Sequence, residues 1–208
     1  MLDEPHPLRG GSLKNCYHTI PPGAVRVPIP DVSQKTQFSC GPAALMAVAR
    51  YYGCGPSCEA DFIEELRKAG MDPRVGAHPT QLQEVAQWLK LNSRIYQPMT
   101  AKQLCGCLLS RKPVLMMLQA WADGEPIRDF REVWSHGHWV VAVGFDRSGV
   151  YFEDPMLEAV RGYLSYRELD ERWHDTGPHG QRLDHLGIAV WKAGRNTSGY
   201  LKRARHID

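Results

Sequence analysis

The hydrophobic pattern of this chain changes its period near the middle, at Pro113. Before that proline, apolar residues recur every three or four positions, as on the buried face of a helix. After it, short runs rich in valine, isoleucine, leucine and aromatic residues are typical of strands. Helices followed by a mostly antiparallel sheet form an α+β architecture. The 208 residues show no internal repeat and no long linker, so we expect one core.

Capping residues and turn residues set the expected limits of the individual elements. The signals predict helices over 39–53 and 57–69, helices opened by capping boxes at Thr80/Gln83, Thr100/Gln103 and Ser165/Glu168, and strands over 24–29, 114–119, 139–145, 150–153, 159–164 and 186–191. Six prolines in residues 1–30 indicate an extended arm, residues 31–192 form the expected catalytic domain, and residues 193–208 form a basic polar tail.

Charge and hydropathy exclude several classes of function. Lys and Arg total 25 against 23 Asp and Glu, a formal charge of only +2, which does not support a nucleic-acid or membrane-surface binder driven by bulk charge. No apolar run approaches the roughly 18 residues of a membrane span, and the first residues lack the basic and apolar regions of a secretion signal. We therefore expect a cytoplasmic protein with reduced thiols, no cofactor, and no nucleic-acid or membrane partner.

The strongest candidate for chemistry is Cys40, which falls at the start of the first expected helix. The unpaired N–H groups and the positive end of the helix dipole stabilise an anion there, so this place favours the thiolate, the reactive form of cysteine. An upstream glutamine amide beside the backbone N–H of Cys40 would make an oxyanion hole. Most intracellular cysteines are only small buried hydrophobes, so position alone does not assign the role.

A thiolate nucleophile needs a base, and the base needs a group that orients it. His136 and His138 precede an apolar strand, and Asp154 stands where the next expected strand ends. Both histidines would share a strand face, so either is a candidate base, although buried structural roles are commoner for a lone histidine or aspartate.

The segments QKTQFSCGPAALMAVARYYG, HWVVAVGFD and VYFEDP together resemble the papain-like peptidases that process bacteriocin leader peptides. In that family a glutamine lies six residues before the nucleophilic cysteine and an aspartate sixteen after the histidine, which are the spacings of Gln34 to Cys40 and of His138 to Asp154. The resemblance implies a papain-like fold, Cys40 as nucleophile, His138 as base, Asp154 as orienting group and Gln34, rather than Gln37, as oxyanion donor.

The chain also departs from the best-known members of that family, which are domains of ABC transporters. It has no membrane span and no GxxxxGK[ST] motif, so an export-coupled role is not expected. Ser39 stands where those transporters commonly carry an acidic residue.

Strand register places a condition on the expected triad. A two-residue turn at Arg147-Ser148 would put His138 opposite Leu157 and Asp154 opposite Val141, three positions out of register and on opposite faces. The triad therefore predicts a longer loop around residues 144–148, or a bulge.

Three alternatives remain open at this stage. The same triad would make an acyltransferase if an amine, rather than water, resolved the acyl-enzyme. The fold would otherwise serve as a non-catalytic peptide-binding module. Cys54, Cys58, Cys105 and Cys107 suggest a four-thiolate zinc site, although the spacing of the second pair is atypical. Trp121 and Trp139 are expected to be buried packing residues rather than part of the cleft, and a peptide or small amide is the expected substrate.

Overall fold

The computed structural model describes residues 18–121, 129–177 and 180–194. In this part of the chain seven antiparallel strands form one sheet in the order β2-β7-β3-β4-β5-β6, and β1 pairs with β4. The strands are β1 (Val25–Arg26), β2 (Asn92–Tyr96), β3 (Val114–Gln119), β4 (Gly137–Phe145), β5 (Gly149–Glu153), β6 (Gly162–Ser165) and β7 (Gly187–Trp191). The helices are α1 (Cys40–Tyr51), α2 (Glu59–Lys68), α3 (Pro79–Trp88), α4 (Ala101–Leu109), α5 (Tyr166–Arg172) and the 3-10 turn η1 (Phe130–Glu132).

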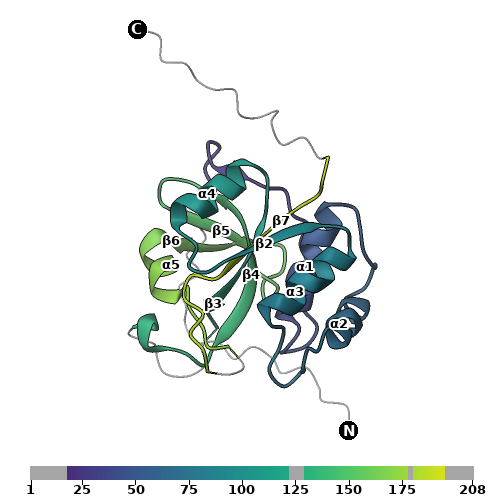
Figure 1. Ribbon diagram of the computed structural model, residues 1–208. Helices are drawn as coiled ribbons and strands as arrows, with labels where there is room; N and C mark the ends of the chain where they lie inside the picture. Colours follow the sequence, from purple (N-terminus) through teal and green to yellow (C-terminus); the bar gives the residue numbers. More distant parts are fainter. Residues whose placement is uncertain (1–17, 122–128, 178–179, 195–208) are drawn as a thin grey trace.

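The helices divide between two sides of this sheet. Figure 1 shows α1, α2 and α3 gathered at one side and α4 and α5 at the other. Helix α1 packs on β4 and on its neighbours α2 and α3, while α5 packs on β5 and β6. One continuous core joins the buried face of α1 to β3, β4 and β7. The α+β architecture expected from the sequence is confirmed. Within the described residues no helix has both the length and the apolar character needed to cross a bilayer.

Most of the expected elements are present, and the capping boxes at Thr100/Gln103 and Ser165/Glu168 are confirmed. The box expected at Thr80/Gln83 is wrong. Helix α3 begins earlier, at Pro79, and His78 is its N-cap: the His78 side chain accepts the N–H of Thr80, and the Gln81 side chain accepts the N–H of His78. Proline suits a first helical position because its missing N–H has no intrahelical partner there.

Two strands differ from the expectation for physical reasons. Strand β2 was not predicted, because Asn92, Ser93 and Arg94 carry no apolar alternation. Within the described residues it is an edge strand whose one partner is β7. The strand predicted over 159–164 begins at Gly162 instead, since Ala159 has a φ of 56°, which interrupts extended backbone.

A β-bulge lies between β4 and β5. The turn is the two-residue one, with the N–H of Asp146 donating to the carbonyl of Gly149 at 3.0 Å. Gly144 pairs with Tyr151, but Ala142 pairs with Phe152, so Val143 is an extra residue on β4. Continued along the strands, this register puts Asp154 opposite Val140, two positions from His138 and on its face. The bulge required by the expected triad is therefore present.

The proposed division into an arm (1–30), a catalytic domain (31–192) and a tail (193–208) stays a prediction, because much of the first and last segments lies outside the described residues. The described part of the arm joins the sheet: β1 pairs with Phe145 and Gly144, and the N–H of Val27 donates to Val143 at the bulge.

Candidate active site

Cys40 is the first residue of α1 and keeps 8% of its surface exposed. Ser39 precedes it in the N-cap position, but its hydroxyl does not cap the helix; it accepts the N–H of Thr36 and donates to the Thr36 carbonyl. The turn from Thr36 to Ser39 leads directly into the first residue of α1. The next residue, Gly41, is buried, and a Cβ there would lie 2.7 Å from the Cβ of Ala77. The glycine thus lets the start of α1 pack closely against residue 77.

His138 joins Asp154 on the same side of the sheet. Its Nε2 lies 2.6 Å from Oδ1 of Asp154, and both side chains are buried. Burial by itself lowers the pKa of His138, but hydrogen bonds to Asp154 and Cys40 and the charges of both groups outweigh it and raise the pKa to about 9. Since Nε2 is used by the carboxylate, Nδ1 is left for the thiol. The imidazole is therefore charged at neutral pH and interacts with both groups.

Three donors hold the Asp154 carboxylate in place. Oδ1 accepts the N–H of Met156 at 2.9 Å in addition to His138, and Oδ2 accepts the indole N–H of Trp121 at 3.1 Å. Trp121 was expected to be a buried packing residue, and that expectation is wrong: it is 43% exposed, with a φ of 55° that is rare for a large side chain. No local pattern identifies this contact, because the two residues lie 33 positions apart. Trp139, by contrast, is buried as expected and donates to the Ala77 carbonyl.

The structure places the backbone of Gln34 beside Pro155, but its side-chain amide bonds the Thr36 carbonyl. The N–H of Gln34 donates to the carbonyl of Pro155, next to Asp154, at 2.9 Å. Its side-chain Nε2 donates to the Thr36 carbonyl at 2.8 Å, while Oε1 is buried without a hydrogen-bond partner in the described chain. Gln37 is exposed. The oxyanion role of Gln34 stays a prediction.

His136 and the other described cysteines lie apart from this arrangement. His136 contacts the Ser135 hydroxyl through Nδ1 at 3.0 Å. Among residues 18–121, 129–177 and 180–194, no three His, Cys, Asp or Glu side chains gather in a way that would hold a metal ion. Cys54, which follows α1, donates to the carbonyl of Ala49 in that helix, Cys58 faces Asp61, and Cys105 faces the Tyr166 hydroxyl.

A family model described as "Peptidase_C39 like family" matches residues 27–180, most of this chain. The chain belongs to the C39-like peptidase family. By family and fold this C39-like protein is a cysteine peptidase, and the resemblance to leader-processing peptidases seen in its motifs is confirmed.

Solved structures share its fold at low sequence identity. A double glycine motif protease from an AMS/PCAT transporter, solved with its leader peptide, is 18% identical, with a TM-score of 0.55, covering 80% of this chain and 94% of that one. A C39-like peptidase of Bacillus anthracis is 14% identical with a TM-score of 0.59, covering 81% and 98%. The peptidase domain of Streptococcus ComA is 20% identical with a TM-score of 0.53, covering 77% and 96%. No curated protein matches the chain. The papain-like fold is thus confirmed.

Proposed function

We propose that this C39-like peptidase cleaves a peptide or small amide through a triad of Cys40, His138 and Asp154. The observation that carries the proposal is the position of His138, which bonds Asp154 at 2.6 Å and interacts with Cys40 at the start of α1. A charged imidazole beside the thiol favours the thiolate, and a carboxylate behind the ring fixes its orientation.

The reaction proceeds in two stages. The Cys40 thiolate attacks the substrate carbonyl, the C–N bond breaks, and His138 donates its proton to the leaving amine, which leaves a thioester on the enzyme. Water then attacks the thioester, His138 takes the water proton, and the C–S bond breaks to release the acid and restore the thiolate. The backbone N–H of Cys40 and one N–H of the Gln34 side-chain amide would stabilise the oxyanion in both stages.

Selective alkylation tests the triad without a known substrate. Burial raises the pKa of the thiols of Cys54, Cys105 and Cys107, so these serve as internal controls. With iodoacetamide at pH 5.5 and peptide mapping by mass spectrometry, we expect Cys40 to react first.

His138→Ala should slow Cys40 toward the rate of the three control thiols, whereas the matched variant His136→Ala should leave it unchanged. If Cys40 in the unaltered protein reacts no faster than the control thiols, the nucleophile is not activated and the chain is a binding module of the same fold.

The mass of the acyl group that a substrate leaves on Cys40 would identify the class of substrate. A peptide is favoured because a solved relative of the same fold was crystallised with a leader peptide. Intact mass of the unaltered protein, quenched in acid during incubation with a peptide mixture, should show a covalent adduct on Cys40, and Gln34→Ala protein should form it more slowly, since weaker oxyanion stabilisation slows attack on the carbonyl. Replacing water by an added amine as acceptor, and looking for the amide product, separates hydrolysis from acyl transfer.

A further inference from the structure

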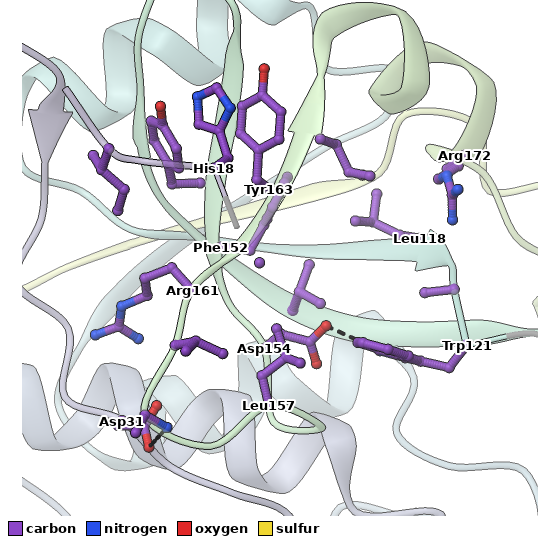
Figure 2. Close-up of a pocket in the computed structure, with 18 of the residues that line it drawn as sticks. His18, Asp31, Leu118, Trp121, Phe152, Asp154, Leu157, Arg161, Tyr163 and Arg172 are labelled. Carbon is purple, nitrogen blue, oxygen red and sulfur yellow. Dashed lines mark hydrogen bonds between the residues drawn. The ribbon is translucent and has the colours of Figure 1, made fainter. Parts of the chain in front are cut away.

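A cavity of about 790 Å³ lies beside Asp154. Neither Cys40 nor His138 lines it; Asp154 is the one member of the proposed triad that does. Its volume falls in the range of roughly 300–1,000 Å³ that is usual for small-ligand sites. Figure 2 shows Arg172 and Trp121 at one end and Arg161 and Asp31 at the other.

The wall of the cavity is mostly apolar and comes from adjacent strands. Leu118 of β3, Val140 of β4 and Phe152 of β5 supply apolar surface from the sheet, and Val160 adds an exposed apolar side chain from the segment before β6. Such a surface binds apolar groups because their burial removes both partners from water.

The two arginines of the cavity differ in how their charges are used. The charge of Arg161 is used within the protein, because its guanidinium pairs with the buried Glu153 and donates to the carbonyl of Ile29. Arg172 is half-buried, with its guanidinium 3.4 Å above the ring of Phe130. In the described parts of the chain the structure records no hydrogen bond or ion pair for the Arg172 guanidinium.

The acidic residues near Arg172 on α5 are already engaged. Glu171 pairs with Arg131 and Arg167, and Glu168 accepts the hydroxyl and the N–H of Ser165. The charges of Glu168 and Glu171 act on Arg172, but among the described residues neither carboxylate bonds its guanidinium. Its N–H groups are therefore open to a ligand there, and a guanidinium held flat on an aromatic ring is well placed for two parallel bonds to a carboxylate.

We propose that this cavity binds an apolar carboxylate, with the acid group on Arg172 and the apolar part on Leu118, Val140 and Phe152. A singly charged acid suits the site better than a phosphate, because Asp31 and Asp154 also line the cavity and would repel a second negative charge. The site goes beyond the proposed peptidase reaction and does not depend on it. The carboxylate has two possible sources, a free chain end or an acidic side chain.

Calorimetric titration of the full chain with short probes tests this site. The probes are N-acetyl-Leu-Phe with a free carboxylate, its C-terminal amide, and N-acetyl-Phe-Asp amide, whose only acid is a side chain. We expect at least one acid probe to bind about tenfold more tightly than the neutral amide. Whichever acid binds better identifies the source.

Arg172→Gln should lower the affinity for the acid probe by about tenfold and leave the affinity for the neutral amide unchanged, since only the charged pair is lost. Arg67→Gln removes the same charge from an exposed position on α2 and should have no effect. If Arg172→Gln protein does not fold, Val160→Asp is the second variant. It adds a negative charge at the exposed wall and should lower the affinity for the acid probe but not for the amide.

Equal affinity for acid and amide, no binding of any probe at millimolar concentration, or full affinity in a folded Arg172→Gln protein would overturn the proposal. Cys40→Ala protein should bind the probes as the unaltered chain does, so a failed peptidase reaction and a failed site give different results.

Discussion

Among the single residues of this C39-like peptidase, His138 joins three parts of the sequence that are far apart. It stands near the start of β4, bonds the carboxylate that follows β5, and interacts with the thiol that begins α1. These partners stabilise the charged imidazole more than burial destabilises it. The free energy of unfolding therefore depends on whether His138 is protonated.

The stability of the protein should depend on pH through this histidine. Its pKa in the folded protein is about 9, above the ordinary value near 6.5, so the native state holds a proton that the unfolded chain releases between these values. Stability from this group is complete below about pH 6.5 and is lost as the pH rises through 9. Urea unfolding at pH 6.5 and pH 9 should show a loss on the order of 1–3 kcal/mol in the unaltered protein.

In His138→Gln protein this loss should be absent, and in His136→Gln protein it should be retained. A pH-dependent loss that is the same in all three proteins would assign the effect to other groups.

In the proposed triad Trp121 would be a positioning residue, because it bonds Asp154 and would act on the imidazole through that carboxylate. Trp121→Phe keeps an aromatic side chain, although a smaller one, and removes the indole N–H that Oδ2 accepts at 3.1 Å. Because the residue is half-exposed, we expect a modest loss, about three- to tenfold in the alkylation rate of Cys40 at pH 5.5, with a stability change of about 1 kcal/mol or less.

A shifted pH profile of alkylation would separate this role from simple packing. Trp121→Phe protein with the rate and pH profile of the unaltered enzyme would show that His138 and Met156 alone hold the carboxylate.

At the scale of secondary-structure elements, the site depends on one bulge and one helix start. The extra residue in β4 moves His138 onto the face of Asp154, and the close packing at Gly41 fixes the beginning of α1. Neither the bulge nor Gly41 takes part in the proposed reaction, yet together they determine how Cys40, His138 and Asp154 lie relative to one another.

Gly41→Ala should misplace the thiol more than it destabilises the fold. The added Cβ would lie 2.7 Å from Ala77 and 3.2 Å from the ring of Trp139, so the start of α1 must shift. We expect a loss of about 1–3 kcal/mol from overpacking and slow, unselective alkylation of Cys40.

Gly106→Ala on α4 is the matched control, because nothing lies within 4 Å of the new Cβ. It should stabilise the protein by up to about 1 kcal/mol through helix propensity and leave Cys40 unaffected. Equal reactivity of Cys40 in the two variants would show that the helix start tolerates the shift.

On the scale of the whole molecule, a buried ion pair fastens the N-terminal segment to the sheet beside the site. Glu153 has none of its surface exposed; it accepts the N–H of Val32 at 2.7 Å and pairs with Arg161, which in turn holds the carbonyl of Ile29. Two residues further on, the N–H of Gln34 reaches Pro155. The segment before α1 and the end of β5 are thus held as one unit.

Arg161→Met should destabilise the protein by about 3 kcal/mol in urea unfolding at pH 7, because it leaves a buried carboxylate without its cation. The double variant Glu153→Gln/Arg161→Met should recover part of that loss, since no lone charge remains buried. Additive losses in the double variant would mean that the two groups are not coupled.

Local sequence signals were sufficient for the order of the α-helices and of every described strand except β2, for the capping boxes at Thr100 and Ser165, and for the position of Cys40 at a helix start. Motif spacing selected His138 and Asp154, and the register argument required a bulge that the structure contains. The predictions of elements succeed because capping and periodicity act between residues close in the chain or regularly placed along it. The catalytic roles of Cys40, His138 and Asp154 stay a prediction.

Tertiary structure alone decided where the bulge falls, that Trp121 bonds Asp154 rather than packing in the core, and that the Gln34 amide turns to Thr36. It also decided that Arg172 faces a cavity while Arg161 is neutralised by Glu153. Contacts of this kind join residues dozens of positions apart, and their partners depend on how strands are aligned and how loops pass over the sheet, which no short stretch of sequence specifies.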